Sequence, residues 1–421
     1  MHLPNKARAC LLACLVPIAV WTPASADTAS ANRNSADSFA VLVGQLLDSS
    51  PSIQAAESQV SAARSRLKGA GLAINNPELD VEAERSDINI FKIGVSQTID
   101  WYDQRSAFEQ AAEAKLAAAQ AELANLKLSL GSELLQTLGK IASYQAINSL
   151  SQRRSDILQR FSELAQQRFN SGDIPPAELE LARLSLTEAV MQQAGDMAGL
   201  IEAKGDFFGL FGQPFNTSLS IPKNLPSRLE PAADIETLAS NHPQVQLAHQ
   251  QAIALARQVD VADRERKANP SFGVNAGREA STNTIGVSFS IPLQINNKFK
   301  SKVDVARAQT LQAEQLAKQA FRSQLARIQG AQQRYQVIVN AWNIWTSQGR
   351  SSLQQRSQLL ESQWQSGEMS TTDYLIQIQQ TLDTQIAGVE LQRDLWNAWI
   401  DWLSSTNQLN NWLNSASKSK S

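Results

Sequence analysis

Cysteine is almost absent from this sequence of 421 residues, and both copies, Cys10 and Cys14, lie near its beginning. They fall in a segment with the features of a secretory signal peptide, because Lys6 and Arg8 give it a basic start and an apolar stretch follows. A small-residue cleavage signal ends at position 26, so residues 1–26 are predicted to be removed. The mature chain then has no cysteine, which excludes disulfides, thiol catalysis and cysteine–zinc sites.

A second interpretation of the N-terminus stays open. Leu11, Leu12 and Ala13 precede Cys14 in the manner that lipoprotein processing requires. Cleavage there would shorten the apolar region and leave a lipid on Cys14. Ordinary cleavage before Asp27 fits the segment better.

Histidine is nearly as scarce as cysteine. The mature chain has only His242 and His249, seven residues apart, whereas a helical metal pair is spaced by four. There is also no glycine-rich phosphate loop, nucleophile elbow or pair of catalytic acids. The sequence therefore predicts no catalytic, cofactor-binding or metal-ligating residue, no cofactor, and a protein that is not an enzyme.

Positive and negative charges are nearly balanced, with 38 Lys and Arg against 40 Asp and Glu, and no block of like charge stands out. Nucleic acid is therefore not expected as a partner. After the leader, no apolar run approaches the roughly 20 residues of a membrane helix. If this chain enters a membrane, we expect it to do so through strands.

What the sequence does contain is one unit that occurs twice. Residues 93–96 and 285–288 are the same tetrapeptide, Ile-Gly-Val-Ser, and lie 192 residues apart. This recurrence indicates an internal duplication with a period of about 192 residues. We expect a first repeat over 27–208, a linker over 209–230, a second repeat over 231–412 and a disordered tail over 413–421.

Each repeat is predicted to contain a helix, a hairpin of two strands, a long helix, a tight tip and a further helix. In the first repeat the hairpin spans 79–101, the long helix 104–171 and the last helix 176–208. The corresponding ranges in the second repeat are 271–293, 297–366 and 370–412. Strand residues alternate between apolar and polar. A helix of such length reaches about 100 Å, so it must pack along other rods as a coiled coil.

Four amphipathic strands are too few to close a barrel, since the smallest membrane barrels have about 8. Unpaired strand edges are not tolerated in lipid, so several chains would have to share one barrel. Trp101 and Tyr102, which lie where a strand meets the long helix, are candidates for an aromatic belt at the membrane interface. The alternative is an ordinary soluble hairpin packed by Trp101.

These motifs, in their order and spacing, resemble the TolC family of outer membrane efflux proteins, also called outer membrane factors. The matching features are the signal peptide, the duplicated halves, Asn76–Leu79 before the first strand, Ile93–Gln97 and the glycine-centred tips. They cover nearly the whole mature chain. Residues 76–82 are most similar to the CzcC-like subgroup, which serves heavy-metal efflux.

The resemblance implies a mainly α fold with a small β part. Duplicated helical hairpins would form a periplasmic α-barrel, and four strands per chain would contribute to a trimeric 12-stranded transmembrane β-barrel. It implies a homotrimer in the cell outer membrane, in contact with outer membrane lipid and with a periplasmic extension. Its partners would be a periplasmic adaptor (membrane fusion) protein and an inner-membrane pump of RND type.

The tips are the best candidates for contact with the adaptor. The family contacts it through a pattern with arginine, glycine and serine, and each tip here keeps half of that pattern. The candidates are Arg168, Gly172, Asp173, Gly367 and Ser370. The alternative is a purely structural role in the helical hairpin, in which glycine permits the turn and Ser370 starts the next helix.

Two carboxylates occupy equivalent places after the tips, Asp373 and Glu178. Repeated by symmetry near the closed end of a tunnel, they would form an anionic aperture that favours cations. A capping box between Ser370 and Asp373 is the simpler interpretation. Arg168 and Asp173 are also candidates for a bridge between tips.

A row of tryptophans at Trp396, Trp399 and Trp402 is predicted to be a packed helix stripe rather than a binding box for aromatic drugs. The function predicted from the sequence is a passive exit duct that carries small solutes, in particular metal cations, to the exterior. The alternatives are the duct of a type I protein secretion system or of a drug efflux pump, and a periplasmic coiled-coil scaffold without a channel.

Overall fold

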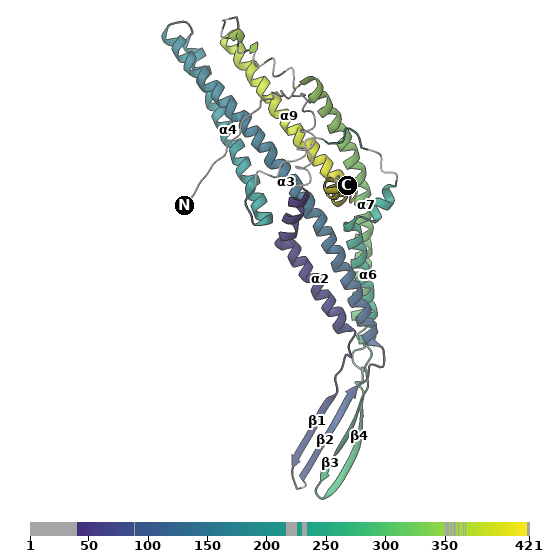
Figure 1. The fold of residues 1–421 in the computed structure, drawn as a ribbon. Helices are drawn as coiled ribbons and strands as arrows, with labels where there is room; N and C mark the ends of the chain where they lie inside the picture. Colours follow the sequence, from purple (N-terminus) through teal and green to yellow (C-terminus); the bar gives the residue numbers. More distant parts are fainter. Residues whose placement is uncertain are drawn as a thin grey trace, which may run out of the picture.

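The computed structural model describes residues 40–87, 89–215, 225–229, 234–349, 353, 356, 359–360, 362–364, 366 and 368–418. The predicted signal peptide, Cys14, Gly367 and much of the predicted 209–230 linker lie outside the described residues. The described part is a long molecule with a narrow sheet at one end and rods of helix over the rest (Figure 1).

The sheet contains four antiparallel strands in the order of the chain: β1 (Glu78–Arg85), β2 (Asn89–Thr98), β3 (Ser271–Glu279) and β4 (Thr282–Ser290). The two hairpins predicted from the sequence are joined, because β2 pairs with β3 along nine residues from Ile90 to Thr98. The duplicated units therefore share one sheet. Its two open edges are β1 and β4.

The helices nearest the sheet follow the same order as the strands. α2 (Pro51–Ala70) packs on α3 (Gln104–Asn170), α3 on α6 (Pro243–Glu265), and α6 on α7 (Lys300–Ile344). Toward the tips, α4 (Pro176–Phe211) packs on α3, and α9 (Thr371–Ser405) lies between α3 and α7 (Figure 1). The molecule is thus a layer that is one helix or strand thick over most of its length.

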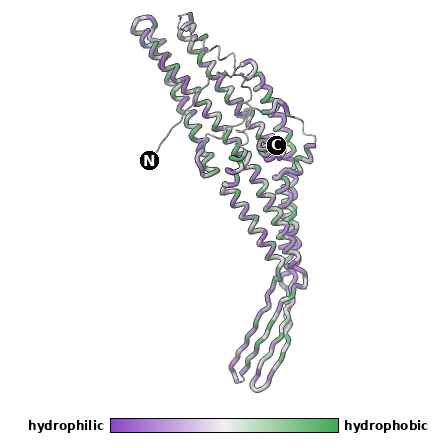
Figure 2. Tube along the Cα trace, in the orientation of Figure 1, coloured by the Kyte–Doolittle hydropathy of each residue, from purple (hydrophilic) through white to green (hydrophobic). Residues whose placement is uncertain are grey.

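The short elements complete the fold. A helix over residues 40–49 precedes α2, and α5 (Ile235–Ser240) leads into α6. Figure 2 shows hydrophilic and hydrophobic positions alternating along the strands and the long helices. This mixture fits elements that bury one face and leave the other exposed.

The structure corrects the predicted course of the second long helix. α7 ends at Ile344 and continues into a π-helical turn, η1 (Trp345–Gly349), where an unbroken helix was expected. The indole of Trp345 lies against Gly388 of α9, in the space that a side chain at position 388 would occupy. A π-turn changes the direction of the following side chains, so it lets Trp345 reach this contact.

The C-terminal region also differs from the prediction. α9 ends at Ser405, and a left-handed residue, Asn407 with φ of 56°, separates it from α10 (Leu409–Lys418). The expected disordered tail over 413–421 is therefore wrong for residues 413–418, which are helical. Leu413 is only 8 % exposed, and its burial explains the order. Residues 419–421 lie outside the described part.

The main core lies midway along the rods, where α3, α7, α9 and α10 meet. Trp396, Trp399 and Trp402 are buried in it, which confirms the predicted helix stripe. The indole of Trp396 donates a hydrogen bond to the carbonyl of Leu135 at 2.7 Å and lies against Gly139. A smaller core near the tips contains Phe161, Trp364 and Tyr374.

Candidate functional site

The sheet has an apolar face that nothing in the chain covers. Leu79, Val95, Val274 and Val287 form one continuous row across the four strands and are 68 %, 48 %, 61 % and 84 % exposed. The next row is also apolar and ends at Ile285, which is 89 % exposed. A patch of this kind is unusual for a soluble monomer and marks a surface that contacts lipid or protein.

The other face of the sheet is polar and crowded. Asp80, Gly94, Asn275 and Gly286 form a row across it. A Cβ atom added at Gly94 would lie 2.9 Å from Cβ of Asn275, and one at Gly286 would lie 2.7 Å from its Oδ1. Glycine thus occupies positions on this face where neighbouring side chains and backbone approach closely.

Carboxylates are concentrated on this polar face along β1. Asp80 accepts a hydrogen bond from Ser96 at 2.9 Å, and Glu82 lies 3.6 Å from the ammonium of Lys92. Glu84 continues the alternation and is exposed. A pore lined by this face would carry more negative than positive charge along β1.

The base of the sheet is fixed by hydrogen bonds between the two repeats. The backbone N–H of Trp101 donates to Asn269 at 3.1 Å, and Asp100 accepts from the N–H groups of Gln104 and Arg105 at 2.7 and 2.8 Å. The Asp100 carboxylate thus caps the N-terminus of α3, which starts a few residues after the end of β2. Trp101 and Tyr102 project there and are 67 % and 39 % exposed, where the sequence predicts an interfacial aromatic belt.

The first tip is a tight helix-to-helix turn. Gly172 has φ of 81°, and the N–H of Asp173 donates to the carbonyl of Arg168 at 2.8 Å, which closes the end of α3. Gly172 and Asp173 are exposed. No ion pair between Arg168 and Asp173 is present within the described part of the chain.

Arg168 instead contacts the other hairpin. Its guanidinium lies over the ring of Trp364, 5.5 Å from the centroid, and that ring stacks on Tyr374 at 4.8 Å. Phe161 completes the aromatic cluster, 4.9 Å from Trp364. Sequence reasoning missed Trp364 as the partner of Arg168, because the two residues are far apart in the chain and no local pattern joins them.

The second tip begins α9 with Ser370 as its N-cap. The hydroxyl of Ser370 accepts from the N–H of Asp373 at 3.1 Å and donates to its carboxylate at 2.7 Å. Glu178 lies at the equivalent place in the first turn of α4 and is half-buried. The structure therefore supports the capping interpretation of Asp373 and leaves both carboxylates near the tips.

Two further polar contacts tie the rods together between the tips and the main core. Arg154 of α3 forms an ion pair with Asp383 of α9. Asp196 of α4 is buried, accepts from Ser151 of α3, and lies 3.3 Å from the amide of Gln192. Because they join different helices, they fix the register of neighbouring rods. Neither pair is indicated by a local sequence pattern.

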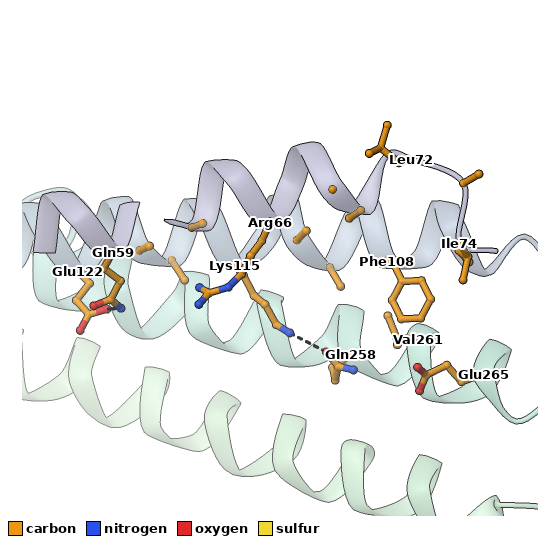
Figure 3. Close-up of a pocket in the computed structure, with 18 residues that line it drawn as sticks. Gln59, Arg66, Leu72, Ile74, Phe108, Lys115, Glu122, Gln258, Val261 and Glu265 are labelled. Carbon is orange, nitrogen blue, oxygen red and sulfur yellow. Dashed lines mark hydrogen bonds between the residues drawn. The ribbon is translucent and has the colours of Figure 1, made fainter. Parts of the chain in front are cut away.

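A groove lies between α2, α3 and α6, close to the sheet (Figure 3). Its walls are rich in alanine and include Phe108. Polar side chains bridge it: Gln59 donates to Glu122 at 3.0 Å, and Lys115 donates to Gln258 at 3.1 Å. None of its lining residues is Ser, Cys or His.

His242 has a structural position at the start of α6. Its Nε2 lies 3.0 Å from the carbonyl of Ser404, and its Nδ1 accepts the N–H of Gln244 at 3.2 Å. These partners require the neutral imidazole with the proton on Nε2. Burial lowers its pKa, and the nearby charge of Arg327 lowers it further.

Neither metal clusters nor membrane helices are found in the described ranges. No group of three or more His, Cys, Asp or Glu residues there is placed to hold a metal ion. Among those residues, no helix is both long and apolar enough to cross a membrane.

Comparison with known proteins gives a consistent picture. Residues 42–204 match the family described as Outer membrane efflux protein. The cobalt-zinc-cadmium resistance protein CzcC of Cupriavidus metallidurans is 26 % identical over 255 residues, which are 58 % of this chain and 60 % of CzcC. The matched region thus spans less than two thirds of that relative's length.

Solved structures share the fold. The outer-membrane channel OprN superposes with a TM-score of 0.71 at 16 % identity, covering 87 % of this chain and 90 % of OprN. The CmeC outer membrane channel of Campylobacter jejuni gives a TM-score of 0.69 at 15 % identity, covering 92 % of this chain and 89 % of CmeC. The likeness extends over both repeats, well beyond the region that matches in sequence.

Proposed function

We propose that this chain is an outer membrane efflux protein of the TolC family and the passive exit duct of a tripartite efflux system. In this proposal three copies form a barrel in the outer membrane and a tunnel of helices below it. Solutes cross by gated diffusion, so no catalytic residue takes part. Energy and selection come from an adaptor and an inner-membrane pump of RND type.

The observation that carries the proposal is the uncovered sheet. Its apolar face is exposed, its polar face carries Asp80 and Asn275 among glycines, and β1 and β4 have open edges. In lipid each unpaired backbone group costs several kcal/mol, so the edges must pair with other strands. Three copies joined edge to edge give twelve strands, with the apolar face toward lipid and the polar face around a pore.

The helices support the same assembly. α2 and α7 lie below β1 and β4, so they are the open edges of the helical layer as well. Toward the tips the open edge on the first side is α4, where Leu184 and Met191 are 66 % and 64 % exposed. On α7, Val337 and Ile344 are 70 % and 63 % exposed. Packing of α4 on α7 of the next copy would bury these side chains.

The tips are proposed to contact the adaptor through Gly172, Asp173 and Ser370. Gly367, which lies outside the described residues, is proposed to belong to the same surface. Arg168 belongs to this surface only in part, because its guanidinium already lies over Trp364. Asp373 and Glu178 are proposed to line the periplasmic aperture. Their positions next to the two tips support this role.

The proposed cargo is divalent metal cations. The support is the likeness to a cobalt-zinc-cadmium resistance protein, together with the carboxylates along the polar face of β1. Carboxylate rings favour cations in pores.

Gene deletion followed by growth assays tests the cargo. Loss of the gene should lower tolerance to cobalt, zinc and cadmium and leave tolerance to common drugs unchanged, and a plasmid copy should restore growth. Loss of drug tolerance alone, or of secretion of a polypeptide, would contradict the proposed cargo while leaving the duct architecture intact.

A further inference from the structure

The base of the sheet in the second repeat carries an exposed strip of apolar and basic residues. The described part of the chain neither covers the apolar residues nor pairs the basic ones with acids. We name the six residues Leu293, Ile295, Lys298, Phe299, Lys300 and Lys302 the basal strip. We propose that this strip docks on anionic phospholipid headgroups in the periplasmic leaflet of the membrane. The inference rests on the proposed function, since it requires that the sheet lies in a bilayer.

The apolar part of the strip continues the lipid-facing side of the sheet. β4 ends at Ser290, and the chain to α7 is irregular. Leu293 and Ile295 nevertheless keep the alternation of Ile285, and both are 76 % exposed. Nothing in the described chain covers them. Exposed aliphatic side chains beyond the last paired residue fit the boundary between acyl chains and headgroups.

The charged part of the strip follows within a few residues. Lys298, Lys300 and Lys302 are exposed, and none forms an ion pair within the described ranges. The ammonium of Lys302 lies 5.2 Å from the ring centroid of Phe299. Along the chain, two aliphatic residues are therefore followed by three lysines grouped around Phe299, which matches the change from hydrocarbon to headgroup phosphate.

The first repeat shows that the fold does not need these cations. At the start of α3 in the first repeat, the nearby cations come from the end of α6 and are paired: Lys267 lies over Tyr102 and pairs with Asp263 at 3.2 Å, and Arg264 pairs with Asp103 at 2.7 Å. One base of the duplicated fold thus neutralises its cations internally, and the other leaves three lysines for an external anion.

Helix stability does not explain the lysines either. Lys300 and Lys302 lie in the first turn of α7, which has no acidic residue. The dipole of a helix favours negative groups at this end and disfavours positive ones. A surface of headgroup phosphates supplies the missing negative charge, and each lysine near such a surface is expected to strengthen attachment about five-fold.

The test compares the trimer in two kinds of nanodisc, one of phosphatidylcholine and one containing phosphatidylglycerol. Phosphatidylglycerol should raise the temperature of thermal dissociation of the wild-type protein. The variant Lys298→Gln, Lys300→Gln, Lys302→Gln should lose most of this rise. Its half-saturating fraction of phosphatidylglycerol should increase at least five-fold.

A matched control removes the same charge elsewhere. Lys204→Gln, Lys318→Gln and Arg322→Gln alter exposed cations on α4 and on α7, and Lys318 is about 27 Å along the helix from Lys300. This control should keep the full stabilisation by phosphatidylglycerol.

Three results would overturn the inference. They are no stabilisation of the wild type, equal stabilisation of the basal-strip variant, or the same rise on adding inorganic phosphate to phosphatidylcholine nanodiscs. In each case the protein still inserts into the nanodisc. Failure to insert at all, or extraction by carbonate, would instead contradict the proposed function.

Discussion

At the scale of single residues, glycines on the polar face of the sheet lie where a side chain has little room. A Cβ atom at Gly94 would lie 2.9 Å from Cβ of Asn275 and 3.0 Å from the carbonyl oxygen of Val274. Gly330 on α7 offers a contrast, because nothing lies within 4 Å of the position of its Cβ. The same substitution is therefore expected to have opposite effects at the two positions.

We expect Gly94→Ala to destabilise the assembled protein by about 1–3 kcal/mol, the usual cost of overpacking. Gly330→Ala should stabilise it by about 0.5–1 kcal/mol, because alanine is the better helix former. Thermal dissociation of the proposed trimer in detergent measures both. A Gly94→Ala protein as stable as the wild type would show that the polar face is not crowded.

His242 should make the stability of the helical region depend on pH. Its folded pKa lies below the ordinary value of about 6.5, mainly because burial disfavours the charged form. The unfolded chain therefore binds more protons, so the contribution is fully present above about pH 6.5 and is lost as the pH falls toward the folded pKa. Protonation would also place a proton on Nδ1, against the N–H of Gln244.

The variant His242→Asn tests this, because asparagine also caps helices but does not titrate. Chemical unfolding between pH 5 and 8 should show a weaker pH dependence in the variant. His249→Asn, at an exposed position on the same helix, should leave the dependence unchanged. An unchanged slope in His242→Asn would rule out this histidine as the cause.

At the scale of elements, the contact between Arg168 and Trp364 joins the two helical hairpins near the tips. A cation–π contact at an exposed site contributes about 0.5–1 kcal/mol. We expect Arg168→Ala to speed hydrogen exchange in the first turns of α9. Arg160→Ala, on an exposed part of the same helix, should have little effect.

A double-mutant cycle with Trp364→Leu separates the pair from general loosening. The two substitutions should show a coupling of about 0.5–1 kcal/mol. Additive effects would mean that Arg168 acts elsewhere, for instance in contact with the adaptor alone.

Some boundaries and contacts of the helices and strands could be predicted from local sequence patterns, and others could not. The start of α3 at Gln104 and its end near Gly172 followed from local signals, namely the apolar period, the glycine and the two prolines. At the π-turn, the indole of Trp345 packs on Gly388, which is remote in sequence and was not predictable from a local pattern. The pairing of β2 with β3 was likewise not predictable, because all four strands have similar amphipathic patterns.

The candidate site likewise contains local contacts that sequence patterns predict and long-range contacts that they do not. Ser370 with Asp373, and Gly172 with its positive φ, follow from short-range capping rules. The stacking of Arg168 on Trp364 and the pair of Arg154 with Asp383 join distant segments, and no spacing rule in one sequence indicates them.

At the scale of the whole molecule, the apolar face of the sheet is proposed to contact lipid and the polar face to line a pore. Ile285 and Thr284 are neighbours on β4 and point to opposite faces. We expect Ile285→Arg to impair insertion into the outer membrane, at a cost of about 2–4 kcal/mol near the bilayer midplane. Thr284→Arg should insert normally.

This comparison separates a membrane sheet from a soluble one. In water, arginine at a position that is 89 % exposed would cost almost nothing. Carbonate extraction of membranes carrying each variant is the measurement. Equal retention of the two variants would favour a soluble scaffold.

The central claim is that one chain cannot seal its own sheet, so copies must share a barrel. Native mass spectrometry of the mature protein released from detergent micelles tests this most directly. The account predicts a single species with the mass of three chains, which loses its fold when detergent is removed. A stable monomer in buffer without detergent would contradict it.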